Sequence, residues 1–594
     1  MAFKRILNIK TKSGGQTAIL VPIILFLVSL FYLLIFMGSL FRYQENSSLF
    51  IYTSEYLKKF IDKPGGLIEY TGNFLMQGYY SPLYGSISVA LIILVFYFIL
   101  LKAGRKLTDK IHLIRIFALL PALMLLVAQT DYEHFMHFNL GFLSVACYFW
   151  IYVSCESRYI RLLFIMLFPV FYYFTGSFAF IFAGLFIIYS LFFEKGISRI
   201  MIPALLILIF AVTFFIFRNF IFYQPVRTLT AYPITLFKMA GLKPIILTLI
   251  FCIILYPALL KAAISLPDFS SVVPRFEPAV YMVLFLLFFI ILYKSYKPDL
   301  AKIIRLETMA ANSDWDGIIN QQEKFPVSNL IAEYYYNLAL SEKGILCDRM
   351  FHGPQDFGPA SLCLPRSSEY YNRSVYFYYT IGMINEARHL AYESMVAYGY
   401  RPGNLKMLIK TELINGNFRV AEKYINDLRQ TFHYRKAAEK FEKLLKNPEL
   451  IRSDHELGRK LLLLPGTDFF IRPEDRDNIN LLFHSNPSNL IVFEYRIAWM
   501  LLEKDFKVAV NEIRNLKLLG YNKIPRHLEE AAVGYSNITK ILPDLGGLSL
   551  RTEVEKDFYE YGSAHNLYSK SKESLAEQME KAWGKTYWYY LQFR

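Results

Sequence analysis

The second half of the chain lacks long hydrophobic runs. After Lys294, 300 residues follow without a segment apolar enough to cross a bilayer. Between Ala18 and Tyr293, by contrast, about nine long apolar segments occur. Each reaches or approaches the ~20 residues that a helix needs to cross a hydrocarbon core of ~30 Å. The sequence therefore predicts an all-α protein, with a polytopic membrane domain at residues 1–293 and a soluble domain at residues 294–594.

Acidic residues are scarce in the membrane domain. Residues 1–293 carry a net charge of +12, whereas residues 294–594 carry only +3. The excess lies mainly in loops beside apolar segments, where it sets orientation, and this argues against nucleic acid as a partner. The spans are expected at roughly 18–41, 83–101, 111–130, 136–153, 159–174, 177–193, 200–222, 244–264 and 279–293.

The basic residues predict the orientation. With the N-terminus in the cytoplasm, fourteen basic residues fall in or beside short inside loops, while eight are spread over two longer outside loops. The positive-inside rule favours this arrangement. We therefore expect a multi-pass protein of the bacterial inner membrane, surrounded by membrane lipids, with its C-terminal domain in the periplasm.

Cysteine is rare, with only five in the chain. Cys347 and Cys363 are the two in the soluble domain, sixteen positions apart. In an oxidising compartment we expect a disulfide between them, which would close the loop and stabilise the fold by a few kcal/mol on an entropic estimate. A pair of free thiols is the alternative.

The soluble domain also lacks alternating apolar and polar residues of the kind that predict strands. Its pattern is amphipathic and helical, and it repeats: Gly382 and Gly416 are 34 residues apart, as are Ala387 and Ala421. This spacing resembles tetratricopeptide (TPR) repeats and implies an α-solenoid of helical hairpins over about 300–540. The aromatic and basic tail after Leu550 is expected to cap the solenoid or to lie against the membrane surface.

Two outside loops carry candidate catalytic residues. The loop 42–82 reads as short amphipathic helices, and it places Glu45 just beyond the exit of the first span. A short turn between the third and fourth spans contains Asp131 and Glu133, followed by His134 and His137, which we expect on one helical face. Carboxylates at a water-facing membrane mouth can act as a general base or hold a divalent cation beside a phosphate. Solvated turn residues are the alternative.

A third outside loop follows the seventh span and contains Arg218 and Arg227. Guanidinium groups there would bind a lipid-linked phosphate in a bidentate manner. Contact with anionic headgroups would explain them equally well.

Together, the long first loop with its early carboxylate, the acidic turn and the C-terminal outside domain resemble the GT-C superfamily of integral-membrane glycosyltransferases. The resemblance covers about residues 1–293. It implies a polyprenyl-phosphate-linked sugar donor, a periplasmic protein or glycan as acceptor, and a divalent cation such as Mg²⁺ or Mn²⁺ held, if at all, by Asp131 and Glu133. The arginine that contacts the phosphate would be Arg218 or Arg227, and His134 and His137 would line the substrate. The whole chain also resembles an uncharacterised family of bacterial polytopic membrane proteins, which implies no chemistry.

Two other functions compete with a glycosyltransferase. One is an envelope assembly factor without enzymatic activity, whose solenoid recruits partners while the spans anchor it. The other is a transporter, which usually places ionisable residues near the bilayer midplane. The predicted spans contain almost no such residues, and this argues against ion coupling.

Overall fold

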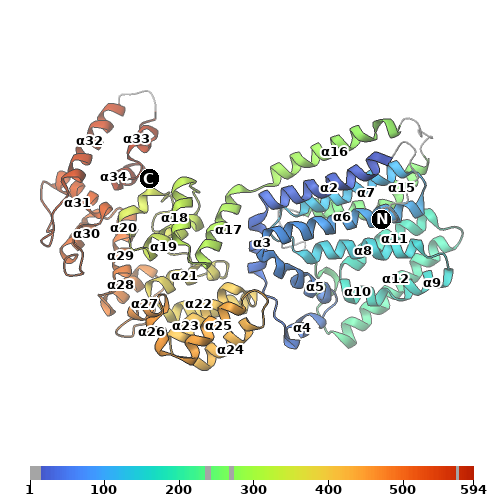
Figure 1. Ribbon diagram of the computed structural model, residues 1–594, viewed down its shortest axis with the longest axis horizontal. Helices are drawn as coiled ribbons and strands as arrows, with labels where there is room; N and C mark the ends of the chain where they lie inside the picture. Colours follow the sequence, from blue (N-terminus) through green and yellow to red (C-terminus); the bar gives the residue numbers. More distant parts are fainter. Residues whose placement is uncertain (1–14, 235–242, 266–272, 570–573) are drawn as a thin grey trace. The chain divides into compact units, whose positions relative to one another are not determined.

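The computed structural model describes residues 15–234, 243–265, 273–569 and 574–594 (Figure 1). Every regular element in these ranges is a helix, and none is a strand, so the all-α prediction is confirmed. The chain divides into two compact units, unit 1 at Met1–Pro298 and unit 2 at Asp299–Arg594. The basic residues before position 15, on which the orientation partly depends, lie outside the described residues.

Unit 1 is a bundle of helices in which α6 packs against α2, α7 and α8, while α11 packs against α8, α12, α14 and α15. Its elements are α2 (Gly15–Phe36), α3 (Gly38–Ser47), α4 (Ser54–Ile61), α5 (Gly66–Met76), η1 (Gln77–Tyr80), α6 (Pro82–Leu107), α7 (Ile111–Ala128), α8 (Met136–Ser154), α9 (Arg158–Met166), α10 (Phe168–Thr175), α11 (Phe178–Phe193), α12 (Ser198–Ile216), η2 (Phe217–Ile221), α13 (Val226–Ala231), α14 (Lys243–Ile254), α15 (Tyr256–Ser265) and α16 (Val273–Ser295).

Six helices in the described part of unit 1 are long and apolar enough to cross a membrane, or up to eight if each of two bent pairs counts as one span. The pair α9 and α10 bends by 45°, and the pair α14 and α15 bends by 51°. In each pair a proline, Pro169 or Pro257, stands near the start of the second helix, where it cannot continue the hydrogen bonding of the first. Together with the shorter apolar helix α11, the described part of unit 1 has nine apolar segments. The described part of unit 1 therefore contains the apolar helices that a multi-pass membrane protein needs.

The first and last long helices of unit 1 run in the same direction. Near their beginnings, Thr17 of α2 donates a hydrogen bond to Glu277 of α16 (3.5 Å). Near their ends, the Tyr32 hydroxyl donates to the carbonyl oxygen of Leu292 (3.3 Å). Since both pairs of ends meet, α2 and α16 run parallel, and as membrane spans they would end on the same side.

The first span ends earlier than predicted. The sequence predicts a span over 18–41, but the helix stops at Phe36, and α3 begins at Gly38 after a break at Met37. Met37 and Leu40 are apolar and buried, so the sequence stays hydrophobic across the break and does not indicate where the helix stops. As a result, Glu45 lies on a helix that packs against η1, α5 and α6.

Unit 2 consists of helices that pack mostly on their neighbours in the sequence. They are α17 (Pro298–Ala311), α18 (Trp315–Lys324), α19 (Leu330–Glu342), α20 (Leu346–Arg349), η3 (Met350–His352), η4 (Gly358–Ser361), η5 (Ser368–Tyr370), α21 (Tyr371–Ile381), α22 (Ile384–Tyr398), α23 (Pro402–Ile414), α24 (Phe418–Arg429), α25 (Arg435–Lys446), α26 (Glu449–Ser453), α27 (Leu457–Leu462), α28 (Asp475–Ser485), α29 (Leu490–Leu502), α30 (Phe506–Asn511), η6 (Glu512–Asn515), α31 (Arg526–Thr539), α32 (Thr552–Tyr568), α33 (Leu575–Trp583) and α34 (Tyr587–Phe593).

The expected disulfide is not formed in this structure, where Cys347 and Cys363 are both buried free thiols. The Cys347 thiol contacts the backbone oxygen of Glu494 at 3.3 Å, and the Cys363 thiol contacts a carboxylate oxygen of Asp475 at 3.2 Å. Each sulfur therefore has its own polar partner on a different helix. The segment between the cysteines packs against α19 and α29 instead of forming a closed surface loop.

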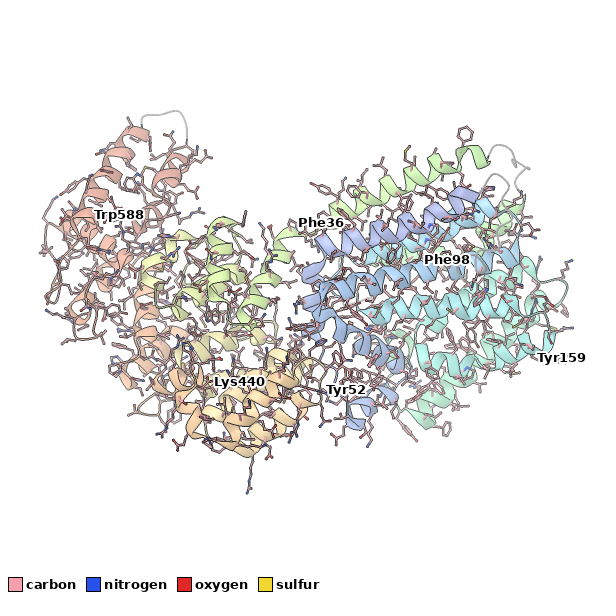
Figure 2. The ribbon with its side chains drawn as sticks, viewed as in Figure 1. Phe36, Tyr52, Phe98, Tyr159, Lys440 and Trp588 are labelled. Atoms are coloured by element: carbon pink, nitrogen blue, oxygen red, sulfur yellow. The ribbon has the colours of Figure 1, made fainter. Side chains whose placement is uncertain are left out.

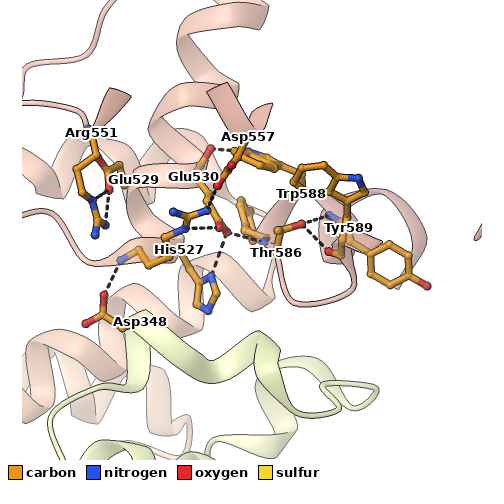
Figure 3. A network of polar contacts seen from close by, with 12 residues as sticks. Asp348, His527, Glu529, Glu530, Arg551, Asp557, Thr586, Trp588 and Tyr589 are labelled. Carbon is orange, nitrogen blue, oxygen red and sulfur yellow. Dashed lines mark hydrogen bonds and ion pairs between the residues drawn. The ribbon is translucent and has the colours of Figure 1, made fainter. Parts of the chain in front are cut away.

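The C-terminal tail packs within unit 2, as expected of a cap. Trp588 lies among the last helices of the chain (Figure 2), where it joins a core with Val533, Val554 and Tyr561. Figure 3 shows the polar contacts beside this core. Glu530 of α31 accepts hydrogen bonds from Arg526, from His527 and from the backbone N–H of Tyr587 at the start of α34. The aromatic residues of the tail therefore cover the end of unit 2.

Two buried carboxyl groups predict a pH-dependent stability of unit 2. Burial raises the pKa of Glu333 to about 7 and that of Glu494 to about 7. Because each folded-state pKa lies above the unfolded value, the stability that each carboxyl group contributes is fully present at low pH. This contribution is lost as the pH rises from about 4.5 to about 7. Between pH 5 and pH 8 we expect the free energy of unfolding to fall in the wild type. In the Glu494→Gln variant it should fall by roughly 2–3 kcal/mol less.

Urea unfolding of the full chain in detergent measures this difference, with thiol labelling of Cys347 and Cys363 as the signal for unfolding of unit 2. Glu503→Gln is the matched control, because Glu503 is partly exposed and pairs with Arg476. Equal pH dependence in the wild type and in Glu494→Gln would contradict the prediction.

Candidate functional site

The sequence-predicted carboxylates gather where α3 packs on the turn between α7 and α8. We call this region the rim site, consisting of α3 and residues 129–139. Gln44 of α3 donates from Nε2 to the backbone oxygens of Tyr132 (3.2 Å) and His134 (3.0 Å). The hydroxyls of Ser39 and Tyr132 share a hydrogen bond of 3.1 Å. These contacts fix a short irregular turn against a helix, so the carboxylates on both are held in place.

Asp131 and Glu133 lie at the open side of the rim site. Asp131 is half-buried and accepts a hydrogen bond at Oδ1 from the backbone N–H of Glu133 (2.8 Å). Glu133 is exposed, and its Oε1 accepts a hydrogen bond from the Tyr43 hydroxyl (2.7 Å). Both carboxylates therefore keep access to water while their backbone is held. This arrangement suits proton transfer with a bound hydroxyl group.

Glu45 differs from the expectation of a carboxylate in water. It lies on the same helix as Tyr43 and Gln44, but its side chain is buried. Its neighbour Arg42 is half-buried, and the guanidinium carbon lies 4.4 Å from the centre of the Tyr80 ring. Sequence reasoning counted Arg42 only as an outside charge. The structure places it on α3, the helix of the rim site, where a guanidinium group can bind a phosphate.

The two histidines lie in the interior of the rim site. Only His137 is on α8, because that helix begins at Met136, so the prediction of one shared helical face is wrong for His134. His134 contacts Asn139 through Nε2 (3.0 Å), and Asn139 Oδ1 also accepts a hydrogen bond from Gln129 (2.7 Å). Gly72 of α5 approaches the backbone of His137 so closely that a Cβ there would lie 2.7 Å from its nitrogen.

Three buried nitrogens of this cluster have no hydrogen-bond partner in the described residues: Nδ1 of His134, Nδ1 of His137 and Nδ2 of Asn139. Burial lowers the pKa of His134 to about 4, so its imidazole is neutral at physiological pH. Buried polar atoms without a partner are uncommon and mark places where water or a ligand completes the site. The rim site thus contains a neutral imidazole, that of His134, whose Nδ1 has no partner among the described residues.

Arg218 and Arg227 occupy a different surface. Arg218 lies on η2 and Arg227 on α13, and both side chains are exposed. The loop that carries them is held against the α10–α11 break, where Tyr172 donates to the backbone oxygen of Leu229 (2.7 Å). Gly176 at this break has φ +61°, and a Cβ would lie 2.5 Å from the Tyr232 oxygen, so only glycine fits. Their loop contacts α10, whereas the rim site is formed by α3 and the α7–α8 turn.

The described residues contain no group of three or more His, Cys, Asp or Glu side chains that could hold a metal ion. Asp131 and Glu133 would supply two ligands at most. A Mg²⁺ or Mn²⁺ ion at the rim site would take its other ligands from water and substrate oxygens, as Mg²⁺ commonly does.

A second polar cluster lies inside the bundle, and sequence reasoning missed it. Glu277 of α16 is 2% exposed, and its carboxylate accepts hydrogen bonds from Tyr281 (2.5 Å) and Arg115 (3.4 Å). It also contacts Nδ1 of His112 at 2.5 Å and Thr17 of α2 at 3.5 Å. The expected spans placed these groups at their ends, in segments far apart in the sequence, so nothing local indicated a pairing.

Comparisons with known proteins place the chain in a family without giving a function. No curated protein matches the chain, and no solved structure matches it. One family model, described as a family of unknown function (DUF6057), matches residues 15–594. Because the match covers nearly the whole sequence, the chain belongs to the DUF6057 family.

Proposed function

We propose that the protein is a membrane glycosyltransferase that moves a sugar or oligosaccharide from a polyprenyl-phosphate-linked donor to a periplasmic protein or glycan. The observation that carries the proposal is the docking of α3 on the α7–α8 turn, which holds Asp131 and Glu133 beside the helix that carries Arg42. A donor with its lipid in the bilayer and its sugar in water needs this combination of apolar body and polar rim.

The proposed step is a displacement at the anomeric carbon. Asp131 or Glu133 takes the proton of an acceptor hydroxyl, whose oxygen forms the new bond to the sugar while the bond to the phosphate oxygen breaks with its electron pair. Arg42 would stabilise the phosphate that departs. Glu45, which is buried on α3, would position Arg42 and Tyr43 instead of acting as the base. Neutral His134 would accept a hydrogen bond from the sugar or the acceptor.

The direction of the helices supports the proposal. The rim site follows the end of α2, and α16 runs parallel to α2, so two such spans would end on the same side of the membrane. A TPR-like soluble domain that follows α16 would then share a compartment with the rim site, where it can present or receive the acceptor. Under the expected orientation this compartment is the periplasm.

Deletion of the gene, followed by mass spectrometry of the glycans on envelope proteins and polysaccharides, tests the proposal. A glycosyltransferase predicts the loss of one glycan, restored by the wild-type chain. Unchanged glycans in the deletion strain would favour an assembly factor that acts through unit 2.

A further inference from the structure

A groove with a volume of about 660 Å³ belongs wholly to unit 2. Side chains from α17, α18, α19, α21, α23, α25 and α27 line it, so it is built from helices spread over about 150 residues of sequence. Lys440 in Figure 2 belongs to its wall. A concave site of this size accommodates a small ligand or a few residues of a polymer.

Glu342 at the end of α19 anchors the floor of the groove. Lys460, which is 1% exposed, donates from Nζ to Glu342 Oε1 (2.7 Å) and to the backbone oxygen of Thr380 (3.1 Å). Arg459 pairs with the other oxygen of the same carboxylate. Burial, and then the nearby Arg459, lower the pKa of Lys460, so an additional anion in the groove would favour its charged form.

Tyr379 of α21 forms one wall. The ammonium groups of Lys410 and Lys460 lie 5.6 Å and 5.2 Å from the centre of its ring. Its hydroxyl donates to Glu456 (3.0 Å), which also pairs with Lys410 (2.5 Å). Trp315 and Tyr376 add two more aromatic rings to the lining.

The chemistry of the lining indicates the ligand. Six Lys or Arg side chains and five carboxylates line the groove, so it offers both hydrogen-bond donors and acceptors, with one more cation than carboxylate. A ligand rich in hydroxyl groups satisfies both kinds of partner, because each hydroxyl donates and accepts. Aromatic rings offer flat apolar surfaces to sugar faces. A phosphate ion would engage the cations but would leave the aromatic rings of the lining without a partner.

We propose that this groove binds an anionic saccharide, with sugar rings against Trp315 and Tyr376 and a ligand carboxylate among Lys410, Arg459 and Lys460. The inference does not depend on the transfer reaction proposed for the rim site. It assigns unit 2 a binding site for a carboxylated glycan.

The test is calorimetric titration of the purified full chain with trigalacturonate, with galactotriose as the uncharged counterpart. We expect trigalacturonate to bind about ten-fold or more tightly than galactotriose, on the scale of hydrogen bonds to charged groups. Lys410→Met should weaken binding by a similar factor, and Lys410→Arg should restore most of it. Lys446→Met is the matched control, because Lys446 is exposed, pairs with Glu442 and does not line the groove.

Three results would overturn the inference. They are no binding of trigalacturonate, equal binding of galactotriose, and tighter binding of inorganic phosphate or of a polyglutamate peptide. Circular dichroism of each variant separates a lost site from a lost fold, and Lys410→Arg provides a folded comparison if Lys410→Met unfolds.

Discussion

Replacement of Glu277 by alanine is expected to lower the free energy of unfolding of unit 1 by about 3–5 kcal/mol, because it leaves the buried Arg115 without its counter-charge. Arg115 is only 3% exposed, and a buried charge that loses a paired carboxylate in a low-dielectric interior is costly. The same change removes the acceptor of Tyr281 and His112. Thermal unfolding of the purified chain in detergent measures the loss.

The matched control is Glu194→Ala. Glu194 also pairs with an arginine, Arg161 at 3.4 Å, but both side chains are partly exposed, at 18% and 31%. Partly solvated pairs contribute about 0–1 kcal/mol, so this variant should unfold close to the wild type. Equal losses for Glu277→Ala and Glu194→Ala would show that the buried cluster adds no special stability.

The second large effect concerns the rim site. Asp131→Asn and Glu133→Gln should each reduce transfer by at least ~10²-fold if the carboxylate they replace is the base, which is the usual scale for a positioned acid-base group. Both changes keep an oxygen that can accept the hydrogen bond from the backbone N–H of Glu133 or from Tyr43. Shape and abundance should therefore be preserved. The measurement is the amount of glycan on envelope acceptors at equal protein levels.

Other variants separate the roles within the rim site. Glu156→Gln is the control, since Glu156 is an exposed carboxylate in the loop between α8 and α9. Glu45→Gln should cost less than Asp131→Asn, because Glu45 is buried. Arg42→Lys should reduce transfer more than Arg218→Lys if Arg42 holds the phosphate in a bidentate manner. The opposite order would indicate that the phosphate binds at Arg218, in the segment after α12.

Local sequence patterns predicted the helices but not their breaks. Apolar runs identify helices in a membrane because every backbone group must be hydrogen-bonded internally. The stop at Phe36 was missed because Met37 and Leu40 continue the apolar run while the chain turns. Gly382 and Gly416, which are 34 residues apart, both adopt positive φ, while the TPR-like solenoid inferred from their spacing stays a prediction.

Contacts between distant segments were beyond the reach of sequence reasoning. The disulfide prediction was wrong because sixteen residues of separation say nothing of where each thiol packs, and Cys347 and Cys363 face Glu494 and Asp475. The packing of α3 on the acidic turn involves Gln44, a residue that no sequence pattern distinguished. The cluster around Glu277 joins three helices whose positions in the sequence gave no common signal.

The most direct test of a transferase at the rim site is the pool of polyprenyl-linked saccharides in the cell, measured by mass spectrometry of lipid extracts. Mass spectrometry detects an accumulated saccharide whatever its sugar composition. Cells with Asp131→Asn or Glu133→Gln, or without the protein, should accumulate a polyprenyl-phosphate-linked saccharide that cells with the wild-type chain consume. An identical pool in the wild type, in both variants and in the deletion strain would contradict a transferase at the rim site.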